Sequence, residues 1–419
     1  RGRRALPDPA RSGAVALAVL AAVVAVQHAP TLVVRDLWWA DEVRHAGVLM
    51  DLRGNGDWLA LRLNGDLYPD KPPVYFWLQA ALQTIAGSDR PRVLFAGLAL
   101  TVLAWFAALW RLGRVVLGEG ALAGVLLLAA TPYVLAITHY ARMDALFAAL
   151  ICLSWASFHR AVAPGDGPDR RAMVAGFAWS AGAVMVKGPF GAALPLAALA
   201  AQAVRRRMPL ADRSVAVGAG LLLAVVVAWA GGIVLAEGPG YFARLIGGQI
   251  VGRTLDGEGI AGAFRYVVTL PLVLLPWSLL VLAAPCGLRH ALRGTGPDGA
   301  DPGYLAICAG TGFLILSAVG EKHEYYLLPI LGPLALLAGV ALPRLAAPAR
   351  RRMRWMVAGG TGIFGATLAL GRWLPVEAGD YAAAIARLWP AGVLALVLAA
   401  ALVALPRVRP VPLMLAGQT

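Results

Sequence analysis

The sequence predicts an all-α polytopic membrane protein. Of its 419 residues, 59% are hydrophobic and only 14% are charged, and the mean hydropathy is +0.70. A chain of this length with so few charged residues cannot cover a soluble core with polar surface. The hydrophobic residues also gather in long runs, many of them sufficient to cross the hydrocarbon core of a bilayer as a helix.

We expect about twelve such spans, separated by short polar segments. The first begins near Gly13 and is followed by many others, so it is expected to be a retained anchor and not a cleaved signal peptide. The runs lie near residues 13–34, 91–110, 121–139, 143–159, 172–187, 189–204, 214–236, 266–287, 303–319, 325–342, 355–371 and 383–405.

The distribution of positive charge predicts the orientation of the chain. If the N-terminus is cytoplasmic, the loops on its side carry an excess of arginine, whereas those on the other side are nearly neutral. Cytoplasmic loops of membrane proteins show this excess. We therefore expect a bacterial inner (plasma) membrane protein with both termini in the cytoplasm and loop 35–90 facing the periplasm or exterior. The net charge of +14 then reflects topology and does not indicate nucleic-acid binding.

The loop at 35–90 is the most polar interval of the chain. Val43 and Met50 are spaced as on one face of a helix, so we expect Asp41–Leu52 to form a short amphipathic helix at the membrane interface. Val74–Gly87 is apolar again and predicts a second interfacial helix. Glycine, asparagine and proline between them predict a folded turn.

Asp41, Glu42 and Arg44 are the first candidates for chemistry in this loop. A carboxylate beside cations at a lipid boundary suits the transfer of a group from a lipid phosphate. The carboxylate takes a proton from the incoming hydroxyl, and the cations stabilise the phosphate leaving group. We expect Asp41 to be the base, with Glu42 as second choice. Alternatively, the acidic pair is solvated or forms a surface salt bridge with Arg44.

Three further segments place unusual polar residues at the same predicted boundary. Asp144 begins a predicted helix, where it could orient the first-loop carboxylate, share a divalent metal with it, or cap the helix. Lys187, followed by Gly-Pro, favours a structural turn. The tyrosines of the last segment also have an ordinary explanation as interfacial residues, and its members are Lys322, His323, Tyr325 and Tyr326.

Lysine is rare in this chain, with three lysines among 37 basic residues. Lys71, Lys187 and Lys322 all fall at the predicted outer boundary. Because an ammonium is a compact point charge, lysine at these positions indicates contacts with a phosphate.

The three cysteines predict neither a disulfide nor a metal site. Cys152, Cys286 and Cys308 lie in or beside apolar runs, without CxxC or Cys/His spacing. Buried thiols are therefore expected.

The motifs together resemble a known family. Asp41-Glu42-Val43-Arg44 is similar to an Asp-Glu-Thr-Arg motif, and Tyr68-Pro69-Asp70-Lys71-Pro72 to a Tyr-Phe-Glu-Lys-Pro motif. Asp144 matches a second acidic position, Lys187 a Lys-Gly-Pro turn, and Lys322–Pro329 a tyrosine-rich helix start. These motifs occur, in this order, in type C (GT-C) glycosyltransferases that use polyprenyl-phosphate sugars. The resemblance is to the group around lipid A 4-amino-4-deoxy-L-arabinose transferase and the protein O-mannosyltransferases.

The resemblance implies a GT-C-like helical bundle with Asp41 as the general base. It also implies a set of contacts with the donor phosphate, made by Arg44, Tyr68, Lys71, Arg253, Lys322 and Tyr325 or Tyr326. Where related sequences often read Glu-His-Val-Gly-Arg, this chain has Gln249 to Arg253. An imidazole that could bind a metal is therefore absent, which weakens the case for a structural metal; a divalent metal is left open. Residues 1–342 are expected to form the catalytic transmembrane module, and 343–419 further helices without a soluble domain.

These expectations describe an enzyme that transfers a sugar from a polyprenyl-phosphate donor to a hydroxyl of a lipid, glycan or protein. The transfer would modify lipopolysaccharide or another cell-envelope glycan. The main alternative is a flippase or transporter of polyprenyl-linked sugars. Transporters commonly show internal repeats and polar residues near the bilayer midplane, and no repeat is evident in this sequence. A third alternative is an assembly subunit that binds phosphate without turnover.

Overall fold

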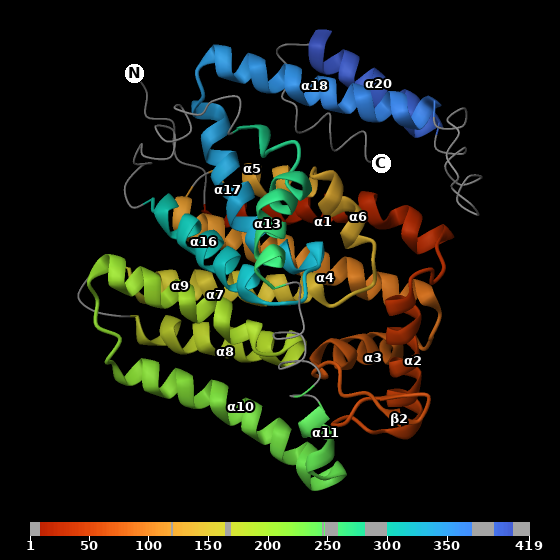
Figure 1. Ribbon diagram of the computed structural model, residues 1–419, viewed down its shortest axis with the longest axis vertical. Coiled ribbons are helices and arrows are strands. Elements are labelled where there is room, and N and C mark those ends of the chain that lie inside the picture. The colour runs from red at the N-terminus through yellow and green to blue at the C-terminus, as the bar shows by residue number, and fades with distance from the viewer. Residues whose placement is uncertain are drawn as a thin grey trace.

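A computed structural model describes residues 9–118, 120–163, 169–244, 247, 259–280, 300–370 and 389–404. The described chain is almost entirely helical, with one short two-stranded hairpin (Figure 1). The predicted all-α class is therefore confirmed.

The helices follow the order of the predicted apolar runs. From the N-terminus to the middle of the chain they are α1 (Pro9–Val34), α2 (Ala40–Asn55), α3 (Val74–Ala86), α4 (Pro91–Leu117), α5 (Ala121–Ala129), α6 (Pro132–Thr138), α7 (Asp144–Ala161), α8 (Arg170–Lys187), α9 (Phe190–Arg206), α10 (Arg213–Glu237) and α11 (Pro239–Arg244). The remainder are α13 (Gly259–Val273), α16 (Pro302–Ala318), the 3-10 helix η2 (Glu324–Leu327), α17 (Leu328–Arg344), α18 (Ala347–Leu370) and α20 (Trp389–Ala404).

Four of the described helices are long and apolar enough to cross a membrane. They cover Ser12–Val34, Pro91–Leu117, Arg213–Glu237 and Glu324–Arg344, and the bent pair α5 and α6 would make a fifth if it is one span. A membrane protein is confirmed, whereas twelve spans are not. Several other predicted runs form helices of 16 to 18 residues, among them α7, α8 and α9.

The predicted span at 121–139 is not one straight helix. It breaks after Ala129, and α6 begins at Pro132 with a bend of 71°. The ring of Pro132 cannot donate a backbone hydrogen bond and disfavours helical geometry in Thr131 before it, so the break lies where the sequence dictates.

The bundle is held by close helix packing around α4 and α7 (Figure 1). Glycine allows a close crossing of α5 and α17. A Cβ added to Gly124 would lie 2.6 Å from the Cα of Leu336, and one added to Gly339 would lie 2.7 Å from the Cα of Gly124. Small residues permit such backbone contact in membrane helices, where apolar side chains gain nothing by leaving lipid.

The loop at 35–90 folds over one end of this bundle. In Figure 1, α2 runs across the ends of the longer helices, with α3 and the hairpin beside it. The strands β1 (Arg62–Leu63) and β2 (Asp66–Leu67) pair across Asn64 and Gly65, both with positive φ. Asn-Gly favours this turn. The hairpin contacts α2 where a Cβ on Gly47 would lie 2.8 Å from Leu63.

Both predicted helices of the loop are present, as α2 and α3. The face of α2 that packs on the protein contains Glu42, His45, Val48, Leu49 and Leu52. The apolar residues from which this helix was predicted lie on its opposite face. Two of them, Val43 and Met50, are exposed. Glu42 and His45 are therefore core residues of the loop.

At the opposite end of the bundle, Asp301 joins three helices. Its carboxylate accepts hydrogen bonds from Arg205, from Arg206 (2.7 Å) and from Gln202 (3.1 Å), all near the end of α9. Its backbone N–H donates to the carbonyl of Val116 at the end of α4 (2.8 Å). These contacts fix the end of the bundle that lies away from loop 35–90.

Candidate active site

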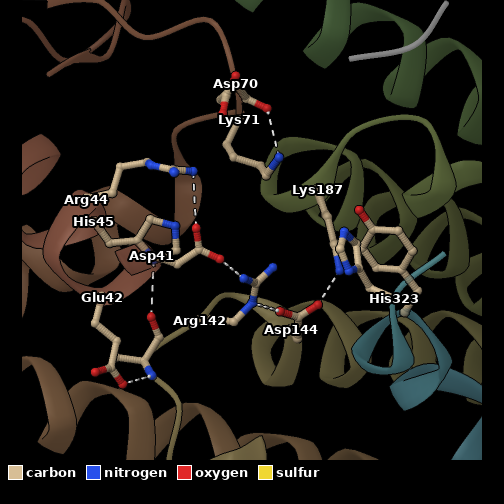
Figure 2. A network of polar contacts seen from close by, with 12 residues as sticks. Asp41, Glu42, Arg44, His45, Asp70, Lys71, Arg142, Asp144, Lys187 and His323 are labelled. Carbon is tan, nitrogen blue, oxygen red and sulfur yellow. Dashed lines mark hydrogen bonds and ion pairs between the residues drawn. The ribbon is translucent and has the colours of Figure 1, made fainter. Parts of the chain in front are cut away.

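The candidate site lies where α2, the segment before α7, the end of α8 and the start of η2 meet (Figure 2). Asp41 stands in the first turn of α2, a position favourable for a carboxylate because the helix dipole is positive there. Its Oδ1 lies 3.1 Å from Nη1 of Arg44, one turn along the helix. The Asp41 side chain is 25% exposed and that of Arg44 is 43% exposed, so this pair forms the open side of the site.

Arg142 connects Asp41 to Asp144. Its Nη1 donates to Oδ2 of Asp41, and its Nε donates to Oδ2 of Asp144 at 2.9 Å. The Arg142 side chain is only 9% exposed. The two acidic positions predicted for the site are thus brought together, with a guanidinium between them.

Asp144 is almost fully enclosed by cations. Oδ1 accepts a hydrogen bond from the ammonium of Lys187 at the end of α8, while Oδ2 is held by Arg142. Its side chain is 5% exposed. Because both oxygens are engaged, Asp144 is suited to anchoring the site and not to taking a proton from a substrate.

Two tyrosines of η2 form an aromatic wall behind these cations. The guanidinium of Arg142 lies 3.8 Å from the ring centre of Tyr325, and the ammonium of Lys187 lies 4.5 Å from that of Tyr326. Both distances are within the range of cation–π attraction. His323 stacks on Tyr325 and forms a 2.9 Å contact with Glu321, so the predicted residues of this segment, apart from Lys322, line the site.

Glu42, the second candidate base, has a structural role. Its buried carboxylate pairs with Arg35 (2.6 Å) and accepts the backbone N–H groups of Trp38 (3.1 Å), Trp39 (3.3 Å) and Ala141 (3.0 Å). These contacts tie the start of α2 to the end of α1 and to the segment before α7. With no exposed surface, Glu42 cannot meet an acceptor hydroxyl.

Tyr68, Asp70 and Lys71 lie on the proline-rich segment between the hairpin and α3, and Figure 2 shows Asp70 and Lys71 above Asp41. The ammonium of Lys71 contacts the carbonyl of Asp70 at 3.2 Å (Figure 2). Burial, reinforced by the charge of Asp70, raises the pKa of Tyr68 to about 12, so its hydroxyl stays protonated. The structure therefore brings three predicted phosphate contacts close together: Tyr68, Lys71 and Arg44.

Lys322 differs from its predicted role as a phosphate contact. Its ammonium donates to carbonyls at the end of α16, those of Leu316 (3.2 Å), Ser317 (2.8 Å) and Val319. A lysine beside a helix C-terminus satisfies carbonyls that have no partner within the helix. Lys322 therefore caps α16.

The described residues include neither the predicted phosphate contact Arg253 nor a site for the divalent metal that the sequence left open. Arg253 and Gln249 lie outside the part of the chain that the structure describes. Within the described part, no group of three or more His, Cys, Asp or Glu side chains is arranged to hold a metal ion.

Sequence reasoning assigned no role to Arg142 and favoured a structural turn at Lys187. The turn is present, since Gly188 has a φ of 80°, but the ammonium of Lys187 also joins the site. The rarity of lysine was the sequence signal for Lys187. The contact of Arg142 with Asp41 had no local signal, because the two residues lie 101 positions apart; the nearby Asp144, two positions along the chain, was the local signal that Arg142 offered.

Acidification is expected to destabilise the loop through His45. Its Nδ1–H donates to the carbonyl of Ala141 at 3.1 Å, and burial lowers the pKa of His45 to about 4. In the unfolded chain the pKa of His45 is near 6.5, so the imidazole binds a proton at a higher pH than it does in the folded protein. His45 therefore favours folding above pH 6.5, where it is neutral in both states. That contribution is lost as the pH falls from 6.5 to 4, at a cost of about 3 kcal/mol.

Thermal unfolding in detergent from pH 7 to pH 4.5 checks this expectation. The midpoint should fall steeply below pH 6.5 in the wild-type chain and less steeply in His45→Gln. Equal slopes for the two chains would assign the acid sensitivity to other groups.

Comparisons with known proteins show which families the chain is similar to. The family profile described as dolichyl-phosphate-mannose-protein mannosyltransferase matches residues 70–230. The undecaprenyl phosphate-alpha-4-amino-4-deoxy-L-arabinose arabinosyl transferase of Edwardsiella ictaluri is 27% identical over 326 residues, 74% of this chain and 56% of that protein. Its counterpart from Pseudomonas aeruginosa strain LESB58 is 30% identical over 322 residues, 73% of this chain and 56% of that protein. The chain spans little more than half the length of these relatives.

Solved structures show the same fold. ArnT from Cupriavidus metallidurans bound to undecaprenyl phosphate superposes with a TM-score of 0.78 at 23% identity, covering 98% of this chain and 75% of that one. The Archaeoglobus fulgidus oligosaccharyltransferase matches with a TM-score of 0.52 at 14% identity, covering 89% and 52%. The chain thus resembles, in sequence and in fold, the GT-C glycosyltransferases around ArnT and the protein O-mannosyltransferases, which confirms the resemblance that its motifs indicated.

Proposed function

We propose that this protein is a membrane glycosyltransferase that moves a sugar from a polyprenyl-phosphate donor to an acceptor hydroxyl. The observation that carries the proposal is the partly exposed carboxylate of Asp41, placed among Arg44, Arg142 and Lys71 at one end of an apolar bundle. The relatives named above are transferases whose names contain undecaprenyl phosphate. A lipid donor reaches such a site from the bilayer, and the acceptor reaches it from the membrane surface.

In the proposed reaction, Oδ1 of Asp41 takes the proton from the acceptor hydroxyl. The acceptor oxygen forms a bond to the anomeric carbon while the bond from that carbon to the phosphate oxygen breaks. Polyprenyl phosphate leaves with the electron pair, stabilised by Arg44, Lys71 and the hydroxyl of Tyr68. Arg253 is proposed as a further phosphate contact, on the strength of its place in the sequence.

A single displacement is supported by the surroundings of the other two carboxylates. A covalent mechanism would need a second exposed carboxylate about 5 Å from the first. Glu42 is fully buried, and Asp144 is engaged by Lys187 and Arg142. The proposed transfer therefore inverts the configuration of the anomeric carbon.

The proposed topology places this site outside the cytoplasm of a bacterial inner membrane. It has about twelve spans, cytoplasmic termini and α2 and α3 in the outer interface, with 1–342 as the catalytic module and 343–419 as additional helices. Support comes from the excess of arginine on the opposite side and from the exposed apolar stripe of α2 containing Val43 and Met50. Packing of α18 against α20 is consistent with a helical C-terminal part.

Transfer of a radiolabelled sugar from undecaprenyl phosphate tests the proposal. The purified chain in lipid nanodiscs is expected to move the label into an acceptor fraction and to release undecaprenyl phosphate. Lys71→Met should raise the KM for the donor by about 10- to 100-fold, because a charged hydrogen bond to phosphate contributes roughly 1.5–3 kcal/mol.

The matched control is Arg90→Met, which removes a positive charge from an exposed position of the same loop and should leave the KM unchanged. Label that changes leaflet in proteoliposomes without leaving its lipid carrier would contradict the transferase and support a flippase. Transfer to lipid, glycan or protein fractions would identify the acceptor class.

A further inference from the structure

Arg142 occupies the centre of a chain of contacts between four charged residues on three segments. Lys187 at the end of α8 holds Asp144 at the start of α7, Asp144 holds Nε of Arg142 (2.9 Å), and Nη1 of Arg142 holds Asp41 at the start of α2 (Figure 2). The order of charges is therefore cation, anion, cation, anion. Each of these four charged groups therefore has a partner of opposite sign, as buried charges require.

The guanidinium of Arg142 is fixed in orientation as well as in charge. It lies 3.8 Å from the ring centre of Tyr325 and 5.1 Å from that of Tyr140, so aromatic rings constrain its plane. Two of its nitrogens are aimed at carboxylates of different segments. An arginine held in this way is pre-organised, because little side-chain freedom remains to be lost during the reaction.

The two oxygens of Asp41 consequently have different environments. Oδ2 is held on the inner side by Arg142, whose side chain is nearly buried. Oδ1 faces Arg44, whose side chain is 43% exposed and can leave Asp41 for a phosphate.

We infer that Arg142 is a positioning residue for sugar transfer: it fixes Asp41 through Oδ2, so that Oδ1 is the oxygen that receives the acceptor proton. The inference rests on the proposed function and assigns to Arg142 a part of it that the sequence motifs do not. Asp144 and Lys187 serve as the anchor of Arg142.

This role differs from binding of the donor phosphate. A phosphate contact contributes to affinity, so its loss raises the KM for the donor. Arg142 has Nε and Nη1 on carboxylates and little exposed surface. Its loss should instead lower kcat, because a misplaced base affects the reacting geometry, and a displacement of about 1 Å can cost on the order of 100-fold.

Arg142→Lys and Arg142→Gln test the inference in nanodiscs with radiolabelled undecaprenyl-phosphate sugar. The lysine keeps a positive charge beside Asp144, so it protects the fold, but it cannot bridge two carboxylates in the same geometry. We expect kcat, normalised to the amount of protein that binds donor, to fall by about 10-fold in Arg142→Lys and about 100-fold in Arg142→Gln. The KM for the donor should change by less than about 3-fold in both.

The double variant Asp41→Asn/Arg142→Lys shows whether Arg142 acts through Asp41. Residues that act as a unit are not additive, so the lysine should cost less than about 2-fold in the Asp41→Asn background. The matched control is Arg206→Gln, which weakens a comparable ion pair with Asp301 at the other end of the bundle and should retain kcat.

Three results would overturn the inference: an unchanged kcat in both Arg142 variants, a rise in KM alone, or additive losses in the double variant. If wild-type protein transfers no sugar at all, the proposed function fails first. The two failures are therefore distinguishable within one set of assays.

Discussion

Asp41→Asn is expected to reduce sugar transfer by about 10²- to 10⁴-fold, the range that a positioned general base contributes. Asparagine keeps the size of the side chain and can still accept a hydrogen bond from Arg142, but it cannot take a proton. Polyprenyl phosphate should bind as before, since Arg44 and Lys71 remain in place. Turnover of radiolabelled donor, measured together with donor binding at equilibrium, checks both halves of this expectation.

Asp36→Asn provides the control for Asp41→Asn. Asp36 is exposed, lies five positions earlier in the same loop and accepts the backbone N–H of Leu37 at 2.7 Å. The substitution makes the same change of charge outside the network around Arg142, so transfer should be retained. Undiminished transfer by Asp41→Asn would remove Asp41 from the role of base. Neither Glu42 nor Asp144 could readily replace it, because both are buried.

The pair Asp41 and Glu42 shows why the sequence identified the site but not the role of each residue. Adjacent helix positions point about 100° apart, because a helix has 3.6 residues per turn. One carboxylate can therefore face an open site while its neighbour enters the core. Which of them does so depends on the face that α2 packs against the protein, and both faces of α2 contain apolar residues. From the sequence alone, the face containing Val43 and Met50 could be taken for the packed face as easily as the one containing Val48 and Leu49. The structure exposes the first pair and buries the second.

Local chemistry, by contrast, was sufficient for several features. The apolar runs predicted the helices because each must satisfy its own backbone polar groups within lipid. The break at Pro132, the hairpin at Asn64-Gly65 and the cap made by Lys322 also follow from residues a few positions apart. Their signals are present in the sequence, although the predictions above did not use them. Contacts between distant segments, such as Arg142 with Asp41, have no such signal.

Glu42→Ala is expected to cost about 3–5 kcal/mol of folding free energy, the range for breaking a buried ion pair by removing one partner. The change leaves the guanidinium of Arg35 uncompensated and three backbone N–H groups, those of Trp38, Trp39 and Ala141, without their acceptor. Unsatisfied buried donors are costly because they have lost water without gaining a protein partner. The start of α2 should detach from the bundle first.

Unfolding in detergent, combined with limited proteolysis of residues 36–58, measures this effect of Glu42→Ala. The matched control is Glu237→Ala, since Glu237 pairs with Arg62 (2.5 Å), which keeps a second partner in Asp57 (2.8 Å). That control should lose only about 1 kcal/mol. If Glu42→Ala were as stable as wild type but inactive, Glu42 would take part in the chemistry, and the division of roles between Asp41 and Glu42 would be reversed. Loss of stability with residual transfer by the folded fraction would instead place Glu42 in the support of the loop and leave proton transfer to Asp41.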